Sequence, residues 1–506
     1  MDILDVVLFG AKYIVCLLIP YFARVSNAYG GFYAWKRNLY LKTWQDHLNH
    51  GPIFRQGPNK LVFNSVKALH DIYLNEYVSK SRCYQAGNVN PKTTNVFNTI
   101  DKSVHRIKRK LVGAVVTERS MRTFEPIMLH QINIFVTQLL SDFQDDSSSQ
   151  DGPGTRVNMS NRCKHLGLDI AGRLAFGYSL NLQTNTENRF LVPIMTAGSW
   201  RINLYMQFPS LRKFRYEIFP YILSRIRGKG YLITLTQMIK ARLAREKQAS
   251  HDLYAHMVDA VDAPEGDKIT LNEIWSEAIF FMPAAGDTIS TTLSALFFYL
   301  SRNPRCRKEL AHEIRTTFAS SDGIKNGAQL ASCRYLRACI DEALRMSPPV
   351  TGTLWREQLP QDGDAPWVVD GHVIPRDVLV GVNIYSIHHN EEYFPDPFRY
   401  NPERWLPSDD TGGAAAAANR AAFVPFSLGA RACAGKTMAY LEISLTMAKT
   451  LWYFDFEPAN RPGTGEKEVN EMGEFLLHDI FTSSHDGPYL SFRPRGNFWK
   501  ELVAQA

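Results

Sequence analysis

A cysteine near the C-terminal end of the chain stands in a segment whose spacing favours metal chemistry. Cys433 lies two residues after Arg431 and two before Gly435, with Gly429 and Phe426 further upstream. The thiolate is the form of cysteine that binds a metal, and a helix N-terminus stabilises that anion. Apolar residues recur after Gly435 with a helical period, so we expect a helix to begin there and to stabilise the Cys433 thiolate.

The flanking residues fit a haem iron as the metal that Cys433 binds. A thiolate ligand pushes electron density onto the iron and favours cleavage of an O–O bond. Gly429 allows a tight turn, and Gly435 allows the following helix to approach the porphyrin. Arg431 can pair with a haem propionate, and Phe426 can shield the sulfur from water. The alternative is an ordinary buried cysteine, which is common for this residue type.

A second candidate segment lies within a long predicted helix. Thr270 and Glu273 form a capping box, and apolar residues then recur with a helical period to about residue 300. A helix of about thirty residues is long enough to cross a domain. Its largely apolar centre predicts burial.

Polar and helix-weakening residues interrupt the centre of this predicted helix. Pro283 and Gly286 both weaken a helix, and together they could open a groove. Asp287 and Thr288 follow directly, and a buried carboxylate is costly unless it is paired or used. Local rules that fail together indicate a functional site. The alternative is a kinked core helix in which Asp287 is capped or paired.

These segments resemble the signatures of the cytochrome P-450 superfamily of haem-thiolate monooxygenases, and the resemblance extends from about Gly51 to the C-terminus. The stretch around Cys433 reads F-x-x-G-x-R-x-C-x-G. Residues 283–288 are similar to the family's A-G-x-D/E-T-T/S motif, in which the acid and the threonine manage protons on the oxygen-binding side of the haem. Asp287 and Thr288 match, and the resemblance implies that they are catalytic. Ala285 and Ile289 depart from the usual Gly and Thr or Ser.

The resemblance gives three charged residues a structural role. Glu342 and Arg345 form E-x-x-R, which places both side chains on one face of a helix. Arg404 lies in Pro402-Glu403-Arg404-Trp405, which matches the family's P-x-R-x. The resemblance implies a buried Glu342–Arg345–Arg404 triad that positions the loop beneath the haem. Without the downstream match, E-x-x-R would be read as a surface ion pair.

The resemblance also implies which residues bind the propionates of haem b. Arg109 and His105 share one helix face, and His105 stands where family members often have Trp. Arg356 follows the E-x-x-R helix at a position where the family offers another arginine. The remaining basic residues of the same segment are expected to face an electron-donor protein, and these are Arg106, Lys108 and Lys110.

Composition limits the class of protein. The 506 residues are 45% hydrophobic and 21% charged, which is ordinary for globular proteins. The seven scattered cysteines favour a reducing compartment over a disulfide framework. A net charge of +7 is modest and favours an acidic partner or a membrane surface over nucleic acid.

The first residues are expected to bind a membrane. Residues 3–25 are largely apolar, and roughly 20 such residues span a bilayer. Asp5 and Lys12 interrupt the stretch, so an interfacial helix lying on the membrane is the alternative. Basic residues cluster at and beyond its end, which favours a cytosolic position for the bulk of the chain. We therefore expect an anchor over residues 1–25 and a catalytic domain over 26–506, and the resemblance implies the endoplasmic reticulum membrane.

The expected fold is the mainly α architecture of the family, with small β-sheets from residues 50–65, 365–385 and 475–493. The resemblance implies a monooxygenase that takes electrons from NADPH through NADPH–cytochrome P-450 reductase. It would insert one oxygen atom from O2 into a small hydrophobic substrate, as a tailoring step in fungal secondary metabolism. Two alternatives remain, a haem-thiolate isomerase or dehydratase and a haem-binding sensor or carrier. Asp287 and Thr288 count against the isomerase, which needs no proton relay.

Overall fold

A computed structural model describes residues 25–85, 88, 93–146, 156–214, 218–243, 270–407, 419–459 and 468–505. The predicted anchor, residues 3–25, lies outside this part of the chain except for Val25. Across the described ranges, no helix combines the length and the apolar character needed to cross a membrane.

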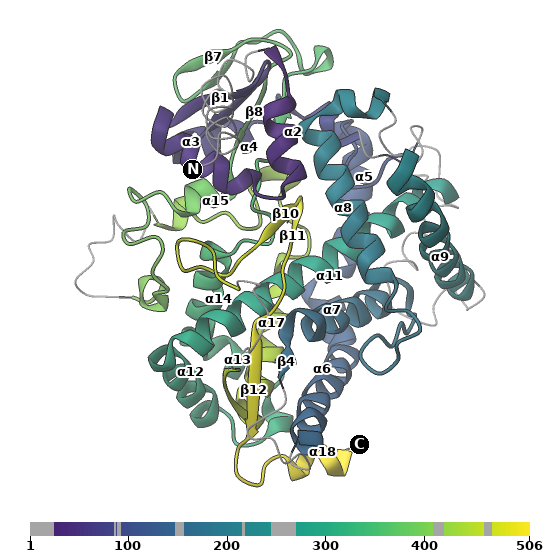
Figure 1. Ribbon diagram of the computed structural model, residues 1–506, viewed down its shortest axis with the longest axis vertical. Coiled ribbons are helices and arrows are strands. Elements are labelled where there is room, and N and C mark those ends of the chain that lie inside the picture. Colours follow the sequence, from purple (N-terminus) through teal and green to yellow (C-terminus); the bar gives the residue numbers. More distant parts are fainter. Residues whose placement is uncertain are drawn as a thin grey trace, which may run out of the picture.

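The described chain is mainly helical, as expected, and α11 runs through its middle (Figure 1). The helices are α2 (Ala28–Trp35), α3 (Leu39–His50), α4 (Val66–Tyr73), α5 (Lys102–Val115), α6 (Glu118–Asp146), α7 (Met159–Phe176), α8 (Leu191–Gln207), α9 (Ile218–Leu243), α11 (Leu271–Arg302), α12 (Pro304–Thr317), α13 (Ala328–Ser332), α14 (Arg334–Met346), α15 (Ile384–His388), α17 (Lys436–Tyr453) and α18 (Lys500–Gln505).

Small sheets lie near α2–α4 and towards α18, and the β10–β11 pair lies between them beside α11 (Figure 1). One sheet has the order β1-β2-β8-β5-β3, another the order β4-β12-β9, and β6–β7 and β10–β11 form separate pairs. The three regions predicted as strands are confirmed. The strands are β1 (Ile53–Gly57), β2 (Lys60–Phe63), β3 (Ser79–Lys80), β4 (Val157–Asn158), β5 (Arg356–Glu357), β6 (Trp367–Val369), β7 (His372–Ile374), β8 (Leu379–Val382), β9 (Phe454–Pro458), β10 (His478–Ile480), β11 (Thr482–Ser484) and β12 (Tyr489–Pro494).

Local sequence signals set the ends of the two helices that frame the site. At the start of α11, the Thr270 hydroxyl accepts from the Glu273 N–H and the Glu273 carboxylate accepts from the Thr270 N–H, which confirms the predicted capping box. Helix α17 begins at Lys436 with Gly435 as its N-cap, as the period after Gly435 predicted.

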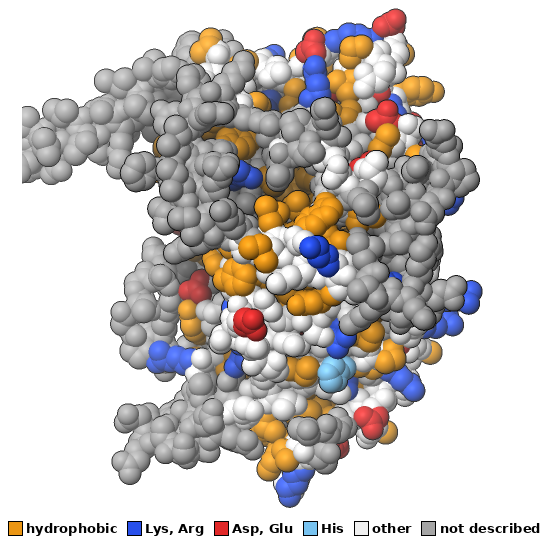
Figure 2. Space-filling view, turned by 90° about the vertical axis from the view of Figure 1, so that its right-hand side faces the viewer, with side chains coloured by type: hydrophobic (Ala, Val, Ile, Leu, Met, Phe, Trp, Pro, Cys, Tyr) orange, Lys and Arg blue, Asp and Glu red, His pale blue; other side chains and the backbone are white. Residues whose placement is uncertain are grey.

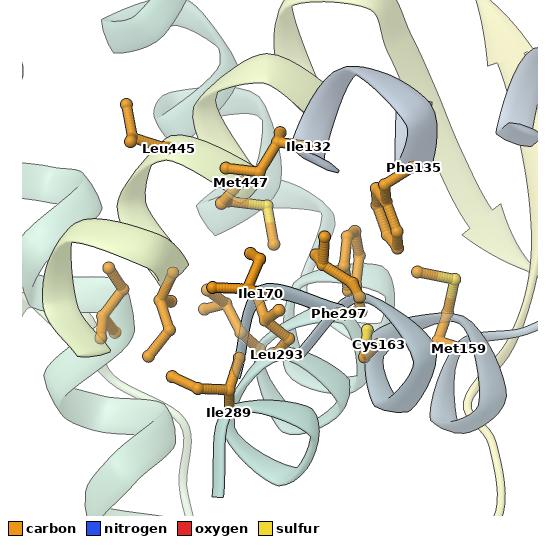
Figure 3. Packing of buried hydrophobic residues seen from close by; sticks show 14 of the residues in the cluster. Ile132, Phe135, Met159, Cys163, Ile170, Ile289, Leu293, Phe297, Leu445 and Met447 are labelled. Carbon is orange, nitrogen blue, oxygen red and sulfur yellow. The ribbon is translucent and has the colours of Figure 1, made fainter. Parts of the chain in front are cut away.

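The main hydrophobic core joins α6, α7, α11 and α17 (Figure 3). Figure 3 shows side chains of the four helices meeting, among them Phe135 of α6, Ile170 of α7, Phe297 of α11 and Met447 of α17. Each of these four is at most 1% exposed. Burial of such apolar side chains is the main stabilising term in folding, so this core holds α11 and α17 in position on opposite sides of the candidate site.

Gly286 lets α11 and α7 approach closely. A Cβ on Gly286 would lie 2.4 Å from Leu168 Cδ2, and a Cβ on Gly167 would lie 3.2 Å from the Gly286 carbonyl oxygen. Gly286 is buried and faces α7, whereas its neighbours Ala285 and Thr288 line the cavity described below. The expectation that Gly286 would help to open a groove is therefore not what the structure shows. This glycine is a packing residue.

Replacing Gly286 with Ala should lower thermal stability, because the added methyl group displaces Leu168. Overpacking of a core costs about 1–3 kcal/mol. The matched control is Gly113→Ala in α5, where a Cβ would meet nothing within 4 Å. That control should be neutral or stabilising by up to about 1 kcal/mol. The measurement is the midpoint of thermal unfolding, and equal shifts in the two variants would contradict the packing role.

Candidate active site

The segment that carries Cys433 is a tight turn held by its own backbone. The Ser427 N–H donates to the Val424 carbonyl at 3.0 Å, and the Cys433 N–H donates to the Phe426 carbonyl at 2.9 Å. Gly429 has φ +69°, and a Cβ there would lie 2.1 Å from a backbone carbonyl oxygen of α4. Only glycine fits this position, because both the backbone conformation and the close approach exclude a side chain.

The Cys433 thiol is exposed to a cavity but otherwise enclosed by protein. Burial raises the pKa of this thiol above its ordinary value. The Gly435 N–H and the charges of Arg109 and Lys436 act in the opposite direction. They favour the thiolate, as expected for a thiol at a helix N-terminus. Coordination to a metal ion removes the thiol proton outright.

The cavity has a volume of about 1760 Å³. Cys433 and Phe426 line it together with Ala284, Ala285 and Thr288 of α11. Sites for drug-sized molecules are usually about 300–1,000 Å³. The cavity therefore has room for a macrocycle and for a second molecule beside it.

Three arginines line the cavity around the turn. The guanidinium of Arg109 donates to the Ala432 carbonyl at 2.6 Å, and that of Arg431 donates to the Thr99 carbonyl at 2.9 Å. Arg356 is buried on β5. In the part of the chain that the structure describes, none of the three forms an ion pair with a carboxylate. Their side chains come from α5, β5 and the turn before α17, so only the tertiary fold brings them together.

The cavity wall is short of negative charge and therefore fits an anionic group. Burial and the nearby Arg356 lower the pKa of Arg431 to about 10. Burial, followed by the charges of Arg431 and Arg109, lowers the pKa of His105 to about 3, which leaves His105 neutral at pH 7. Lys80, which no sequence motif indicated, lines the same wall. Two carboxylates brought by a haem would relieve this repulsion, so the residues present fit the propionates of haem b.

Asp287 and Thr288 are adjacent in α11, but their side chains lie in different surroundings. The Asp287 carboxylate is fully buried, pairs with Lys164 of α7 and accepts a hydrogen bond from the Thr482 hydroxyl at 3.1 Å. Thr288 lines the cavity, and its hydroxyl donates to the Ala284 carbonyl at 2.7 Å. Thr482 also lines the cavity, so its hydroxyl connects the acid to that space. Lys164 and Thr482 belong to no motif and could not be found from the sequence.

Glu342, Arg345 and Arg404 meet in a buried network. Glu342 accepts from Arg345 at 2.9 Å, from Arg404 at 3.1 Å and from the Trp405 indole at 2.9 Å. Burial alone would raise the pKa of Glu342, but Arg345 and Arg404 outweigh it and hold the pKa below its usual value. The carboxylate therefore stays ionised within the core.

His388 connects this network to the turn that carries Cys433. The Arg345 guanidinium donates to the His388 carbonyl at 3.0 Å, and the Val424 N–H donates to His388 Nε2 at 3.0 Å. Val424 in turn accepts from Ser427 at the start of the turn. His388 thus acts as a structural link.

One expectation about the basic segment of α5 is wrong. Lys108 is only 2% exposed, and its ammonium pairs with Glu273 at 3.1 Å and Glu277 at 3.2 Å. It ties α5 to α11 and is not available to a partner protein. Arg106 and Lys110 are exposed. The error arose because the two glutamates lie more than 160 residues away along the chain and carry no signal near Lys108.

Comparisons with known proteins agree with this geometry. A family model described as cytochrome P450 matches residues 30–479. The chain is 30% identical over 491 residues to cytochrome P450 monooxygenase apf7 of Gibberella fujikuroi, which covers 94% of this chain and 92% of that protein. It is 33% identical over 476 residues to cytochrome P450 monooxygenase poxM of Penicillium oxalicum, with 94% and 89% covered. It is 30% identical over 486 residues to cytochrome P450 monooxygenase AKT7 of Alternaria alternata, with 94% and 91% covered.

Replacing Arg345 with Ala should destabilise the protein by about 3–5 kcal/mol, because it leaves the Glu342 charge buried with too few partners. Arg337→Ala on the same helix is the matched control. Arg337 pairs with Asp341 at 2.9 Å, but its side chain is 51% exposed. Loss of such a surface pair costs at most about 1 kcal/mol. Thermal unfolding measures both variants, and a similar loss in both would rule out a special role for the buried network.

Proposed function

This chain belongs to the cytochrome P450 family, and on that premise we propose that it performs a tailoring oxidation in fungal secondary metabolism. Members of the family are monooxygenases with haem b as cofactor, and the activity of this chain is that of an oxidoreductase. The reaction converts R–H, O2, NADPH and a proton into R–OH, water and NADP⁺. The proposed electron donor is NADPH–cytochrome P-450 reductase, and the proposed substrate is a small hydrophobic molecule.

The observation that carries the proposal is the position of Cys433 in the cavity. Cys433 and Thr288 of α11 line the same cavity, whose other lining residues are largely apolar and include Arg109, Arg356 and Arg431. Haem b, when bound to Cys433, supplies the chemistry that activates oxygen. The protein residues bind its carboxylates, exclude bulk water and hold the substrate on the α11 side.

Cys433→Ala should abolish the red-shifted absorption band that the ferrous–CO complex shows only with a thiolate ligand. The reason is that Cys433 is the only cysteine that lines the cavity within the described residues. Cys306→Ala is the matched control, since Cys306 is buried in α12. The control should keep the band. A band that survives in Cys433→Ala would overturn the assignment of the metal ligand.

We also propose that Asp287 and Thr288 deliver protons into the cavity. The Thr482 hydroxyl is within hydrogen-bond distance of the Asp287 carboxylate and lines the cavity, so it offers the acid a path to that space. The Thr288 hydroxyl lies on the cavity side of α11, where it can position a water molecule. Proton transfer by positioned groups typically contributes about 10²–10⁴-fold to a rate.

Thr288→Ala should keep haem and substrate bound but reduce the ratio of product formed to NADPH consumed by about tenfold, with hydrogen peroxide released instead. Asp287→Asn should slow turnover more than it weakens binding. Thr292→Ala, one helical turn further along α11, is the control for a general loosening of the helix. Its hydroxyl donates to the Thr288 carbonyl. Unchanged coupling in both Asp287→Asn and Thr288→Ala would exclude the proton relay.

The proposed docking surface for the reductase consists of Arg106 and Lys110 of α5. Both are exposed, and they lie on the helix that carries Arg109 into the cavity wall. Electrostatic docking weakens with salt. Electron transfer from the reductase should therefore slow at high ionic strength and in the double variant Arg106→Glu, Lys110→Glu. Lys325→Glu is a charge-reversal control at an exposed lysine outside this surface. Rates that respond to neither salt nor charge reversal would exclude this surface.

The proposed location is the endoplasmic reticulum membrane, with residues 1–25 as the anchor and the catalytic domain in the cytosol. In support, Val25, Phe32 and Trp35 at the start of the described chain are 76%, 45% and 56% exposed. Trp is enriched where proteins meet the membrane interface. Deleting residues 1–25 should move the protein towards the soluble fraction while haem binding persists. Loss of haem in that variant would contradict the division between anchor and catalytic domain.

A further inference from the structure

Four aromatic rings from separate parts of the chain meet in the wall of the cavity. They are Tyr84, Phe97, Phe280 of α11 and Phe481 between β10 and β11, and we call them the ring cluster. The Phe97 and Phe280 rings are stacked, with centroids 4.9 Å apart and planes 13° apart. Phe481 meets Phe97 edge-on at 5.0 Å, and Tyr84 meets Phe97 edge-on at 5.3 Å.

The ring cluster keeps apolar surface free inside the cavity. Tyr84 is 1% exposed, but Phe97, Phe280 and Phe481 are only partly buried although they lie within the molecule. Since all three line the cavity, their remaining exposed surface faces its interior. Figure 2 looks at the right-hand side of the view in Figure 1 and shows hydrophobic side chains gathered in the middle of that face. Helices α8 and α9 also contribute lining residues to the cavity.

The backbone holds Phe481 in place at a conformational cost. Phe481 has φ +85°, a conformation that residues with side chains rarely adopt. The buried Asp479 carboxylate accepts from the Phe481 N–H and from the Asn203 amide of α8, both at 3.0 Å. Strained conformations persist where the surrounding structure determines them, and they concentrate at binding sites. The tip of the β10–β11 pair therefore presents a ring, not a turn residue, to the cavity.

Phe280, the member of the ring cluster on α11, lies away from the reacting side of the cavity, whereas Phe481 is the chain neighbour of Thr482, which contacts Asp287. Phe280 precedes Thr288 by eight residues in the same helix, which corresponds to about 12 Å along the axis. A molecule held against Phe280 must therefore extend about 12 Å along α11 to reach the space between Thr288 and Cys433. Short substrates cannot occupy both places.

We propose that the ring cluster selects an elongated substrate with an aromatic group at one end, and that the carbon to be oxidised lies on its apolar part, about 12 Å away along α11 when the aromatic group stacks on Phe280. This inference rests on the proposed monooxygenase function. Aromatic rings prefer offset-stacked and edge-to-face arrangements with one another, and such pairs gain about 0.5–1.5 kcal/mol beyond the area that they bury. Phe280 and Phe481 provide such partners, since the Phe97 ring is already stacked on Phe280 and has the Lys80 ammonium over it, 3.7 Å from its centroid. The substrate group that the ring cluster recognises is a planar π-system. The place where this group binds determines which carbon of the substrate is oxidised.

The test uses two matched probes, 6-phenylhexan-1-ol and 6-cyclohexylhexan-1-ol, which differ only in the ring. Equilibrium dialysis with the haem-loaded full chain measures the dissociation constant of each without any need for turnover. The phenyl probe should bind about fivefold more tightly, which corresponds to about 1 kcal/mol. The cyclohexyl group is the more hydrophobic of the two, so burial alone predicts the opposite order. Equal binding, or preference for the cyclohexyl probe, would overturn the proposal.

Variants assign the preference to the ring cluster. Phe280→Leu and Phe481→Leu should each reduce the fivefold preference to about twofold or less. Phe281→Leu is the matched control, since Phe281 lines the same cavity but is not part of the ring cluster. It should keep the preference. The ferrous–CO band confirms that each variant is folded. Loss of the preference in the control, or its persistence in both cluster variants, would contradict the assignment.

This design separates the inference from the proposed function. If the phenyl probe is not preferred while the ferrous–CO band and NADPH-dependent product formation are intact, only the proposed substrate class is wrong. Absence of the band, or of oxygen consumption with a reductase, would remove the monooxygenase function whatever the probes show. The two failures are read from different measurements.

Discussion

A single buried carboxylate connects the helical core to the segment that presents the thiol. Glu342 accepts hydrogen bonds from two arginines and an indole. The Arg345 guanidinium donates to the His388 carbonyl, and the His388 ring accepts from a backbone N–H just before the turn. Removing one partner from such a network leaves an uncompensated charge in a region of low dielectric. The turn at Cys433 is held by its own backbone hydrogen bonds and a short 3₁₀ segment. The charge network links the start of this turn to the helical core.

In the cavity the buried charges are positive, and they lie close together. Arg356, Arg431 and Arg109 are brought close to one another without a carboxylate partner among the described residues, and burial followed by their positive charges lowers the pKa of His105. A folded protein holds such a cluster at a cost in stability unless an anion binds there. Binding of a dianionic cofactor returns that cost, so this cluster couples cofactor retention to stability.

Helix α11 serves three purposes through three faces. Gly286 packs against α7, Asp287 is held by Lys164 and Thr482, and Thr288 lines the cavity. Because successive residues of a helix point in different directions, one short segment can combine packing, a buried acid and a cavity-facing hydroxyl. The tip of the β10–β11 pair reaches the same region, where Thr482 contacts the acid and Phe481 contributes a ring. The proposed substrate contact and the proposed proton supply therefore meet at this tip.

The sequence by itself determined the features that depend on neighbours in the chain. The turn at Gly429, the start of α17 after Gly435, the capping box at Thr270 and the shared face of Glu342 and Arg345 are all local patterns. Each is set by backbone conformation or by a spacing of three or four residues, and each is found in the structure.

Only the tertiary structure decided which distant residues meet. Lys108 was predicted as a surface charge, yet it is buried against Glu273 and Glu277. The roles of Lys164 and Thr482 beside Asp287 could not be predicted from the sequence, because these residues lie far from Asp287 along the chain. The same holds for the ring cluster. The energy of such contacts comes from burial and from charges brought together across the fold. A local sequence pattern does not predict which residue of a distant helix or strand a given side chain will contact, because such contacts form only when the helices and strands pack together.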